Sequence, residues 1–343
     1  MLELEQRPRR LGDLDSSLQH DGAASIARCH ANQGRLAPGA SRFEPECNAA
    51  GHVSRRQQEL EENVSSDAPP IPDQLCELVL ARLGIERPIP VTLDTLRRLF
   101  RAWCRCTGWD TVALALRSIE LRAGPATGFP APNYFRRWLA YGISDVCFAN
   151  SEALLALLRA LGFVTERVLG TGGSNSSHGS VLVRIDDRRY LVDPTFLAEE
   201  PLPLLPSERS TAGAGPLKVW ADTDGTIRWQ PPQCRFHAVF RIEECDCSFA
   251  SFRAQHQLVE AGDDEHALAR LYHDKLFVRR NVDGGVRTYD NGLIISKSER
   301  RSNIAKAIGD QRHLLTTEFG IAAELVAQIP PRFFSHCEAQ SAR

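Results

Sequence analysis

The chain has 343 residues, of which 43% are hydrophobic and 24% are charged, and its formal net charge at pH 7 is −2. Its length suits two or three globular domains, and its composition excludes a coiled coil, a collagen or a wholly disordered chain. Because the charges nearly balance, no field of one sign is available to hold a polyanion, so we expect no nucleic-acid partner and no membrane partner.

Apolar residues occur in short runs, and none of these runs approaches the ~20 residues of a membrane-spanning helix. The first ten residues, MLELEQRPRR, lead into polar sequence rather than into the apolar stretch of a secretory signal. We therefore expect a cytoplasmic protein. The ten cysteines lack a module-like spacing, which favours reduced thiols over a disulfide framework.

Residues 1–73 differ in composition from the rest of the chain. They contain eight arginines and twelve acidic residues, few aromatics, and a proline-rich end, DAPPIPD. Such a segment buries too little apolar area to offset its chain entropy, so we predict a disordered arm. The alternative is a short regulatory helix over residues 55–63.

Residues 74–165 have the periodicity of amphipathic helices. Apolar residues recur every three or four positions in one run that stops at Gly84 and in a second run that Thr92 opens. A third run begins at Cys147 and ends at Gly162. We expect these residues to form a helical domain.

The start of the third run is a position where a thiol can become reactive. Ser144 and Asp145 are candidate N-caps, so Cys147 is predicted to lie in the first turn of the helix. The aligned peptide dipoles of a helix N-terminus favour a thiolate there. An ordinary buried thiol at a helix start is the alternative.

Residues 166–265 change to the two-residue periodicity of β-strands. The segments Val181–Ile185 and Arg189–Asp193 flank Asp186-Asp187, which predicts a β-hairpin. Further short strands are predicted over residues 218–220, 226–229 and 237–242. We expect an antiparallel sheet or barrel here.

Residues 266–343 are predicted to form an α/β lid domain. Three strands come first, over residues 276–279, 286–289 and 292–296, and two helices follow near residues 310–319 and 322–328. Helices, then strands, then strands with helices make an α+β fold: an N-terminal helical bundle, a central antiparallel β-barrel and the C-terminal α/β lid.

The predicted hairpin brings two polar residues to one end of the sheet. His178 lies just before the outgoing strand, and Asp193 lies at the end of the returning strand. Together with Cys147 they match a Cys-His-Asp arrangement, in which the histidine deprotonates the thiol and the aspartate fixes the imidazole tautomer. Taken singly, the histidine could be a solvated loop residue and the aspartate a turn former.

Two cysteine pairs allow a metal interpretation, which we do not favour. Zinc sites usually use C-x2-4-C spacing, whereas both pairs here are C-x-C. We expect ordinary thiols and no metal at these positions, which are Cys104 and Cys106, and Cys245 and Cys247 with Cys234 and His237 nearby.

Motifs around the candidate triad extend over much of the chain. They run from Cys147-Phe148 through Leu161-Gly-Phe163 and Tyr190-Leu-Val-Asp193 to Glu200-Pro-Leu-Pro-Leu204. Fifteen residues separate His178 from Asp193, and fifteen separate Cys147 from Gly162. In these motifs and spacings, over about residues 75–335, the chain resembles the arylamine N-acetyltransferase family.

This resemblance implies a ping-pong acyl transfer on a Cys-His-Asp core like that of cysteine proteases. A thioester of coenzyme A or of an acyl carrier protein would acylate Cys147, and a small amine, hydroxylamine or hydrazine would then take the acyl group. Acyl-coenzyme A is thereby expected as a co-substrate, with no tightly bound cofactor. The resemblance also makes Phe196 a wall of the acyl or acceptor pocket and Trp109 a further substrate-binding residue.

The chain departs from the family pattern beside the nucleophile. The family's Arg-Gly-Gly-x-Cys is here Ile143-Ser-Asp-Val-Cys147, and its Asp-Val-Gly-Phe-Gly is Asp193-Pro-Thr-Phe-Leu197. We therefore expect a preferred donor or acceptor other than acetyl-coenzyme A and a simple arylamine. An amide synthase, a transglutaminase-like enzyme or a thiol hydrolase with the same triad is the alternative, followed by a non-enzymatic binding protein.

Overall fold

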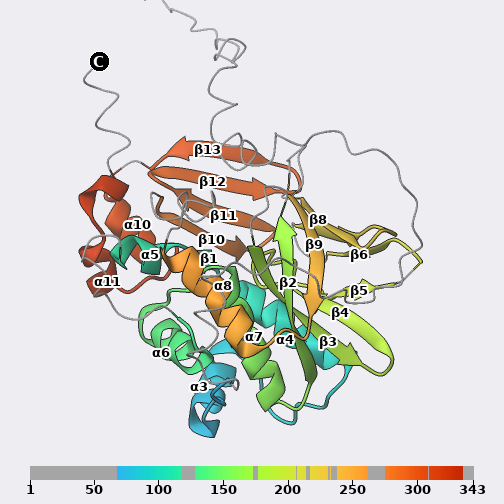
Figure 1. The fold of residues 1–343 in the computed structure, drawn as a ribbon. Helices are drawn as coiled ribbons and strands as arrows, with labels where there is room; N and C mark the ends of the chain where they lie inside the picture. The colour runs from blue at the N-terminus through green and yellow to red at the C-terminus, as the bar shows by residue number, and fades with distance from the viewer. Residues whose placement is uncertain are drawn as a thin grey trace, which may run out of the picture.

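The structure is a computed structural model that describes residues 68–117, 128–172, 177–205, 207–213, 217–230, 232, 238–261, 275–307 and 309–334. The predicted arm up to residue 67 lies outside the described residues, as do Cys234 and His237. N-terminal helices, a nearly closed eight-stranded antiparallel sheet and a C-terminal five-stranded antiparallel sheet with helices make up the fold (Figure 1). This architecture confirms the predicted α+β fold class.

The N-terminal helices begin and end close to the predicted signals. Gly84 ends the first of them in the left-handed conformation, with φ 68°. Thr92 caps the second by accepting a hydrogen bond from Thr95 N at 3.2 Å. The helices are α3 (Asp73–Leu83), α4 (Leu93–Cys106), α5 (Val112–Arg117), α6 (Ala131–Tyr141) and α7 (Cys147–Ala160).

The larger sheet has the strand order β5-β4-β3-β2-β9-β8-β7-β6, and its neighbouring strands are antiparallel. Its two end strands meet, because Ser210 of β6 donates a hydrogen bond to the carbonyl of Pro203 in β5. The strands are β2 (Val164–Gly172), β3 (Ser177–Ile185), β4 (Arg188–Val192), β5 (Leu202–Leu204), β6 (Ser210–Ala212), β7 (Lys218–Ala221), β8 (Thr226–Gln230) and β9 (Ala238–Cys245).

The predicted hairpin is present as β3 and β4, with one correction. His178 lies within β3 and not before it, because the strand continues outward by pairing with β2, where His178 is opposite Gly170. Asp193 follows β4 directly, as expected.

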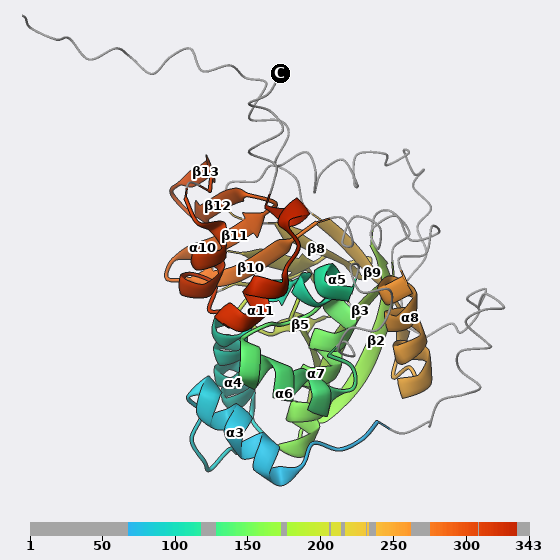
Figure 2. The ribbon, with the colours of Figure 1, turned by 90° about the vertical axis from the view of Figure 1, so that its left-hand side faces the viewer.

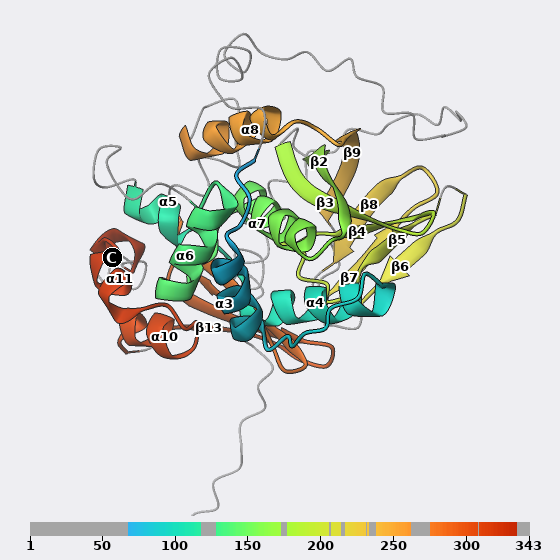
Figure 3. The same ribbon diagram turned by 90° about the horizontal axis from the view of Figure 1, so that it is seen from below.

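Helix α7 packs against β2 and β3, and α8 (Phe249–Ala261) packs on α7 and β2 (Figure 3). Nearly every residue of α7 from Cys147 to Leu158 is buried. The helix that begins at the candidate nucleophile is therefore the central helix of the core. The sequence pattern did not indicate α8.

The C-terminal sheet has the order β1-β10-β11-β12-β13, and its first strand comes from the N-terminal helical region. Helices α10 and α11 pack on this sheet together with α5 (Figure 2). Among the described helices, none is both long and apolar enough to span a bilayer. The elements are β1 (Trp109–Asp110), β10 (Phe277–Val282), β11 (Gly285–Asp290), β12 (Leu293–Ser298), β13 (Ser302–Lys306), α10 (Gln311–Thr317), α11 (Ala323–Gln328) and the 3-10 helix Pro331–Phe333.

Candidate active site

Cys147 is the first residue of α7 and is 8% exposed. The expectation that Ser144 or Asp145 caps this helix is wrong, because the N-cap is Val146. The two polar side chains bind elsewhere. Ser144 Oγ accepts a hydrogen bond from Gly108 N at 2.8 Å, and Asp145 Oδ2 accepts one from Gly128 N at 2.9 Å.

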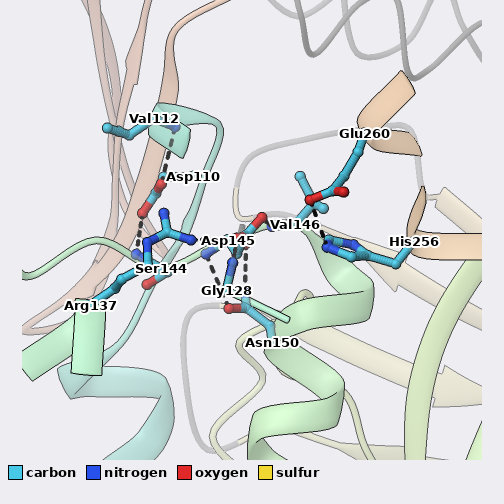
Figure 4. A network of polar contacts seen from close by, with 10 residues as sticks. All are labelled: Asp110, Val112, Gly128, Arg137, Ser144, Asp145, Val146, Asn150, His256 and Glu260. Atoms are coloured by element: carbon cyan, nitrogen blue, oxygen red, sulfur yellow. Dashed lines mark hydrogen bonds and ion pairs between the residues drawn. The ribbon is translucent and has the colours of Figure 1, made fainter. Parts of the chain in front are cut away.

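A network of hydrogen bonds holds the three residues before Cys147 in place (Figure 4). Asp110 of β1 accepts from Ser144 N at 2.6 Å through Oδ2 and from Val112 N at 3.1 Å through Oδ1. Asn150 of α7 donates through Nδ2 to the Asp145 carbonyl at 2.8 Å. Burial raises the pKa of Asp110 to about 6, against the lowering effect of the hydrogen bond from Ser144. The thiol is thus fixed from its N-terminal side.

Both oxygens of the Asp145 carboxylate have partners in the surrounding backbone and in α6. Besides Gly128 N, it accepts from Val146 N at 2.8 Å, and Arg137 Nη1 lies 3.5 Å from its Oδ2. Figure 4 shows Arg137 directed toward this carboxylate. These contacts engage both oxygens of the Asp145 carboxylate and hold it in place beside the start of α7.

Helix α8 supports this loop from a different direction. His256, which is 1% exposed, stacks on Phe129 with ring centroids 5.1 Å apart, and Phe249 stacks on the same ring at 5.2 Å. His256 also lies 3.2 Å from Glu260 (Figure 4). Phe129 follows Gly128, so α8 steadies the backbone that binds Asp145.

His178 and Asp193 form a direct pair across β3 and β4. His178 Nε2 lies 2.7 Å from Asp193 Oδ2, and the aspartate is 3% exposed. The other carboxylate oxygen accepts hydrogen bonds from Thr195 N at 2.8 Å and Phe196 N at 3.1 Å. The carboxylate is therefore held by the turn that it precedes, and it orients the imidazole.

The imidazole also contacts Cys147. Burial alone would lower the pKa of His178, but the Asp193 carboxylate and the hydrogen bond with Cys147 raise it from 6.5 to about 10. Because Nε2 faces the aspartate, Nδ1 is the ring nitrogen left for the thiol. The structure thus brings the three residues together in the order cysteine, histidine, aspartate.

Aromatic rings enclose the imidazole. Phe196 stacks on His178 with centroids 5.4 Å apart and planes at 12°, and Phe240 meets the ring edge-on at 4.9 Å. Trp229 stacks on Phe196 with ring centroids 5.8 Å apart. The family resemblance named Phe196 as a pocket wall, which stays a prediction, whereas nothing in the sequence singled out Trp229 or Phe240, although both lie on short strands with apolar alternation.

Trp109 lies in β1, where its ring meets Phe277 edge-on at 5.2 Å. It is 6% exposed and is part of the core shared with the C-terminal sheet. Its role in substrate binding stays a prediction.

Three hydrogen bonds fix the helix that carries the thiol: one reaches β3, which carries the imidazole, and two reach the neighbouring strand β2. Ser151 Oγ donates to the Gly179 carbonyl at 2.9 Å, next to His178. Glu152 and Arg167 form a buried two-bond ion pair between α7 and β2, at 2.7 and 3.0 Å. The spacing between Cys147 and His178 is therefore set by buried contacts that allow little motion.

Three of the four cysteines in the pairs considered for a metal site have the environment of structural thiols. Burial raises the pKa of the thiols of Cys104, Cys106 and Cys247. Within the described ranges, no cluster of three or more His, Cys, Asp or Glu residues is arranged to hold a metal ion.

No protein-family model and no curated protein matches this chain. Solved structures do match it. The arylamine N-acetyltransferase of Mycobacterium abscessus is 17% identical with TM-score 0.62, covering 75% of this chain and 94% of its own. The Mycobacterium marinum enzyme in complex with CoA is 15% identical with TM-score 0.61, covering 76% and 99%. A Bacillus cereus arylamine N-acetyltransferase, described with a Cys-His-Glu catalytic triad, is 15% identical with TM-score 0.58, covering 72% and 98%.

These matches confirm the predicted resemblance at the level of the fold. The described chain has the fold of arylamine N-acetyltransferases at low sequence identity.

Proposed function

We propose that this chain, which has the fold of arylamine N-acetyltransferases, is a cysteine-dependent acyltransferase. It moves an acyl group from a thioester to a small amine, hydroxylamine or hydrazine. The observation that carries the proposal is the series Cys147, His178 and Asp193, in which the partly buried imidazole pairs with the buried carboxylate and interacts with the buried thiol.

The first half of the reaction acylates the enzyme. Cys147 attacks the thioester carbonyl as a thiolate paired with the His178 imidazolium, and the carbon–sulfur bond of the donor breaks as the new thioester forms. The departing donor thiolate takes the proton of His178 Nδ1. The imidazole is then neutral, since acylation removes the sulfur charge that helped to hold its proton.

The second half transfers the acyl group. The amine attacks the carbonyl of the acyl-Cys147, and neutral His178 accepts the proton that the nitrogen loses. Collapse of the tetrahedral intermediate forms the amide and returns the Cys147 thiolate beside an imidazolium. Asp193 keeps the imidazole oriented through both halves because its position is held by Thr195 N and Phe196 N.

Acyl-coenzyme A is the donor that we propose, and an acyl carrier protein is the alternative source of the same thioester. A solved structure with this fold contains CoA, which supports the first. Phe196 contributes an apolar wall beside the imidazole and Trp109 a further substrate contact. Pro194 and Thr195, where the family has small residues, make the backbone path beside the thiol bulkier, so we expect donors other than acetyl-coenzyme A to react better.

Mass spectrometry of the intact protein tests the proposal. The chain is mixed with a panel of coenzyme A thioesters, and the adduct is located by peptide mapping. We expect an acyl group on Cys147 that an added amine discharges. Cys147→Ala should carry no adduct, whereas the matched variant Cys106→Ala should behave like the wild type.

Two other outcomes would redirect or refute the assignment. An adduct that only water discharges indicates a thiol hydrolase with the same three residues. A Cys147→Ala variant that still forms the adduct contradicts the nucleophilic role of this cysteine.

A further inference from the structure

Arg279 is a buried arginine that takes no part in the reaction steps above. It lies on β10 with 7% of its surface exposed, and its register partner in the sheet is Trp109. A long cationic side chain loses solvation and rotamer freedom on burial, so such a position needs specific contacts to offset the loss. Two of its contacts lead to the candidate triad.

The first contact places the guanidinium at one end of a stack of planar side chains. Arg279 Cζ lies 4.9 Å from the centre of the Trp229 ring. Trp229 stacks on Phe196 with planes at 14°, and Phe196 stacks on His178 with planes at 12°. Trp229 Nε1 also donates to the Phe196 carbonyl at 3.1 Å, which fixes two layers to each other. Each layer limits the tilt of the next, from the guanidinium to the imidazole.

The second contact reaches the carboxylate end of the triad. The Arg279 guanidinium donates a hydrogen bond to the Thr195 carbonyl. Thr195 N in turn donates to Asp193 Oδ1 at 2.8 Å, while Asp193 Oδ2 binds the imidazole. One side chain of the C-terminal sheet therefore supports both the face of the imidazole and the turn that carries its partner.

We propose that Arg279 is a positioning residue of the triad, which holds the His178 imidazole and the Asp193 carboxylate in line with Cys147. The inference rests on the proposed function, because the thiol and imidazole form the pair that it aligns. It acts through Phe196 and Thr195 and not on the reacting atoms.

The chemistry of arginine explains why this residue suits the position. Its planar guanidinium covers an aromatic face while its fork of N–H groups reaches a carbonyl at the edge. Lysine retains the charge and one donor but lacks the plane, and methionine retains only the apolar length. Arg279→Lys should therefore recover part of what Arg279→Met loses.

The test measures activation of the thiol without any acyl donor. Full-length chains are treated with iodoacetamide from pH 5 to pH 9, and the alkylation rate of Cys147 is followed by peptide mass spectrometry. A thiolate paired with an imidazolium reacts quickly well below the pH at which a free thiol does. We expect Arg279→Met to lower the rate at pH 6 at least about tenfold, with a profile closer to that of a free thiol.

Arg312 provides a matched control. Its Cζ lies 4.5 Å from the centre of the Phe334 ring, and its guanidinium donates to the carbonyls of Val326 and Ile329. Arg312→Met thus removes the same kinds of contact from the C-terminal part of the chain. It should leave the alkylation profile unchanged.

The outcomes separate the two proposals. Suppose that Cys147 is alkylated quickly at pH 6 in the wild type and that Arg279→Met and Arg312→Met both keep this rate. This result overturns the positioning role alone. A wild-type Cys147 that reacts no faster at pH 6 than a free thiol overturns both proposals. If Arg279→Met does not fold, Trp229→Phe provides the test, because it reduces the ring that lies between Arg279 and Phe196. Slower alkylation of Cys147 at pH 6 supports the positioning role, and an unchanged alkylation profile overturns it.

Discussion

Asp193 uses its two carboxylate oxygens for different tasks. Oδ1 binds the backbone of Thr195 and Phe196, and Oδ2 binds the imidazole. Asp193 is thus both the turn former and the partner of His178. The two interpretations of its position in the sequence, as a turn residue or as a member of the candidate triad, therefore hold together. Because Oδ1 fixes the carboxylate before any substrate binds, the imidazole is oriented in advance.

The raised pKa of His178 has a consequence for stability. A group whose pKa is higher in the folded state than in the unfolded state stabilises the fold below its unfolded value, here 6.5, and loses that contribution as the pH rises toward about 10. We expect unfolding by urea to need less denaturant at pH 10 than at pH 6.5. Asp193→Asn should flatten this dependence, because it removes the carboxylate that raises the pKa.

The same variant should also slow the acylation of Cys147 by about 10²-fold or more, since the thiol remains but the imidazole is poorly held. Urea titrations across pH 6.5–10 and single-turnover acylation rates check both effects. An Asp193→Asn protein with the wild-type pH slope would show that His178 owes its charge to other groups.

At the scale of elements, the close approach of α7 and α8 to β3 determines where the thiol meets the imidazole. Gly179 lies in β3 beside His178, and a Cβ there would come within 2.6 Å of the Phe148 ring and 2.7 Å of the Phe252 ring. These two rings meet each other edge-on at 5.1 Å. Only a residue without a side chain lets both helices pack this near to the strand.

Gly179→Ala should therefore destabilise the fold by ~1–3 kcal/mol, because the added methyl group forces the rings apart. The same shift moves α7 away from β3, so Cys147 alkylation at pH 6 should slow as well. Chemical unfolding and alkylation rates measure the two effects. Phe252→Leu, which opens space, should recover part of both losses in the double variant; no recovery would contradict the packing argument.

The whole molecule builds the site from segments far apart in sequence, and this limits what the sequence alone could predict. Gly84, Thr92 and the Asp186-Asp187 turn act on their own neighbours, so local patterns located them. The hairpin then supplied His178 and Asp193 as a pair.

Other features depend on distant partners. Ser144 and Asp145 have the composition of helix caps, but Gly108 and Gly128 engage their side chains, which left Val146 as the cap. The two-residue strand β1 is too short to show a period, and its partner is β10. The supporting contacts of Arg279 likewise join β10 to β8 and to the turn after β4, a combination that no local window contains.

The N-terminal segment should contribute little to this assembly. The described chain begins at residue 68, and Ile71 is already buried in the core. A truncated chain should therefore retain Ile71. Deleting residues 1–67 is expected to leave the melting temperature and the acylation rate of Cys147 nearly unchanged. Differential scanning calorimetry and the adduct assay compare the two chains. A large fall in melting temperature would mean that the segment packs on the core.

The pairing of β1 with β10 also sets the order of events during synthesis. Trp109 and Asp110 leave the ribosome long before Phe277–Val282, their partners in the sheet. Until that strand emerges, Asp110 lacks the sheet that positions it to bind Ser144 N, just before Cys147. The carbonyl of Thr195 likewise lacks the hydrogen bond from Arg279. A nascent chain that already contains Cys147, His178 and Asp193 is therefore expected to lack these supporting contacts. If Cys147 is the nucleophile proposed above, we expect it to become reactive only once the C-terminal sheet has paired with the rest of the chain.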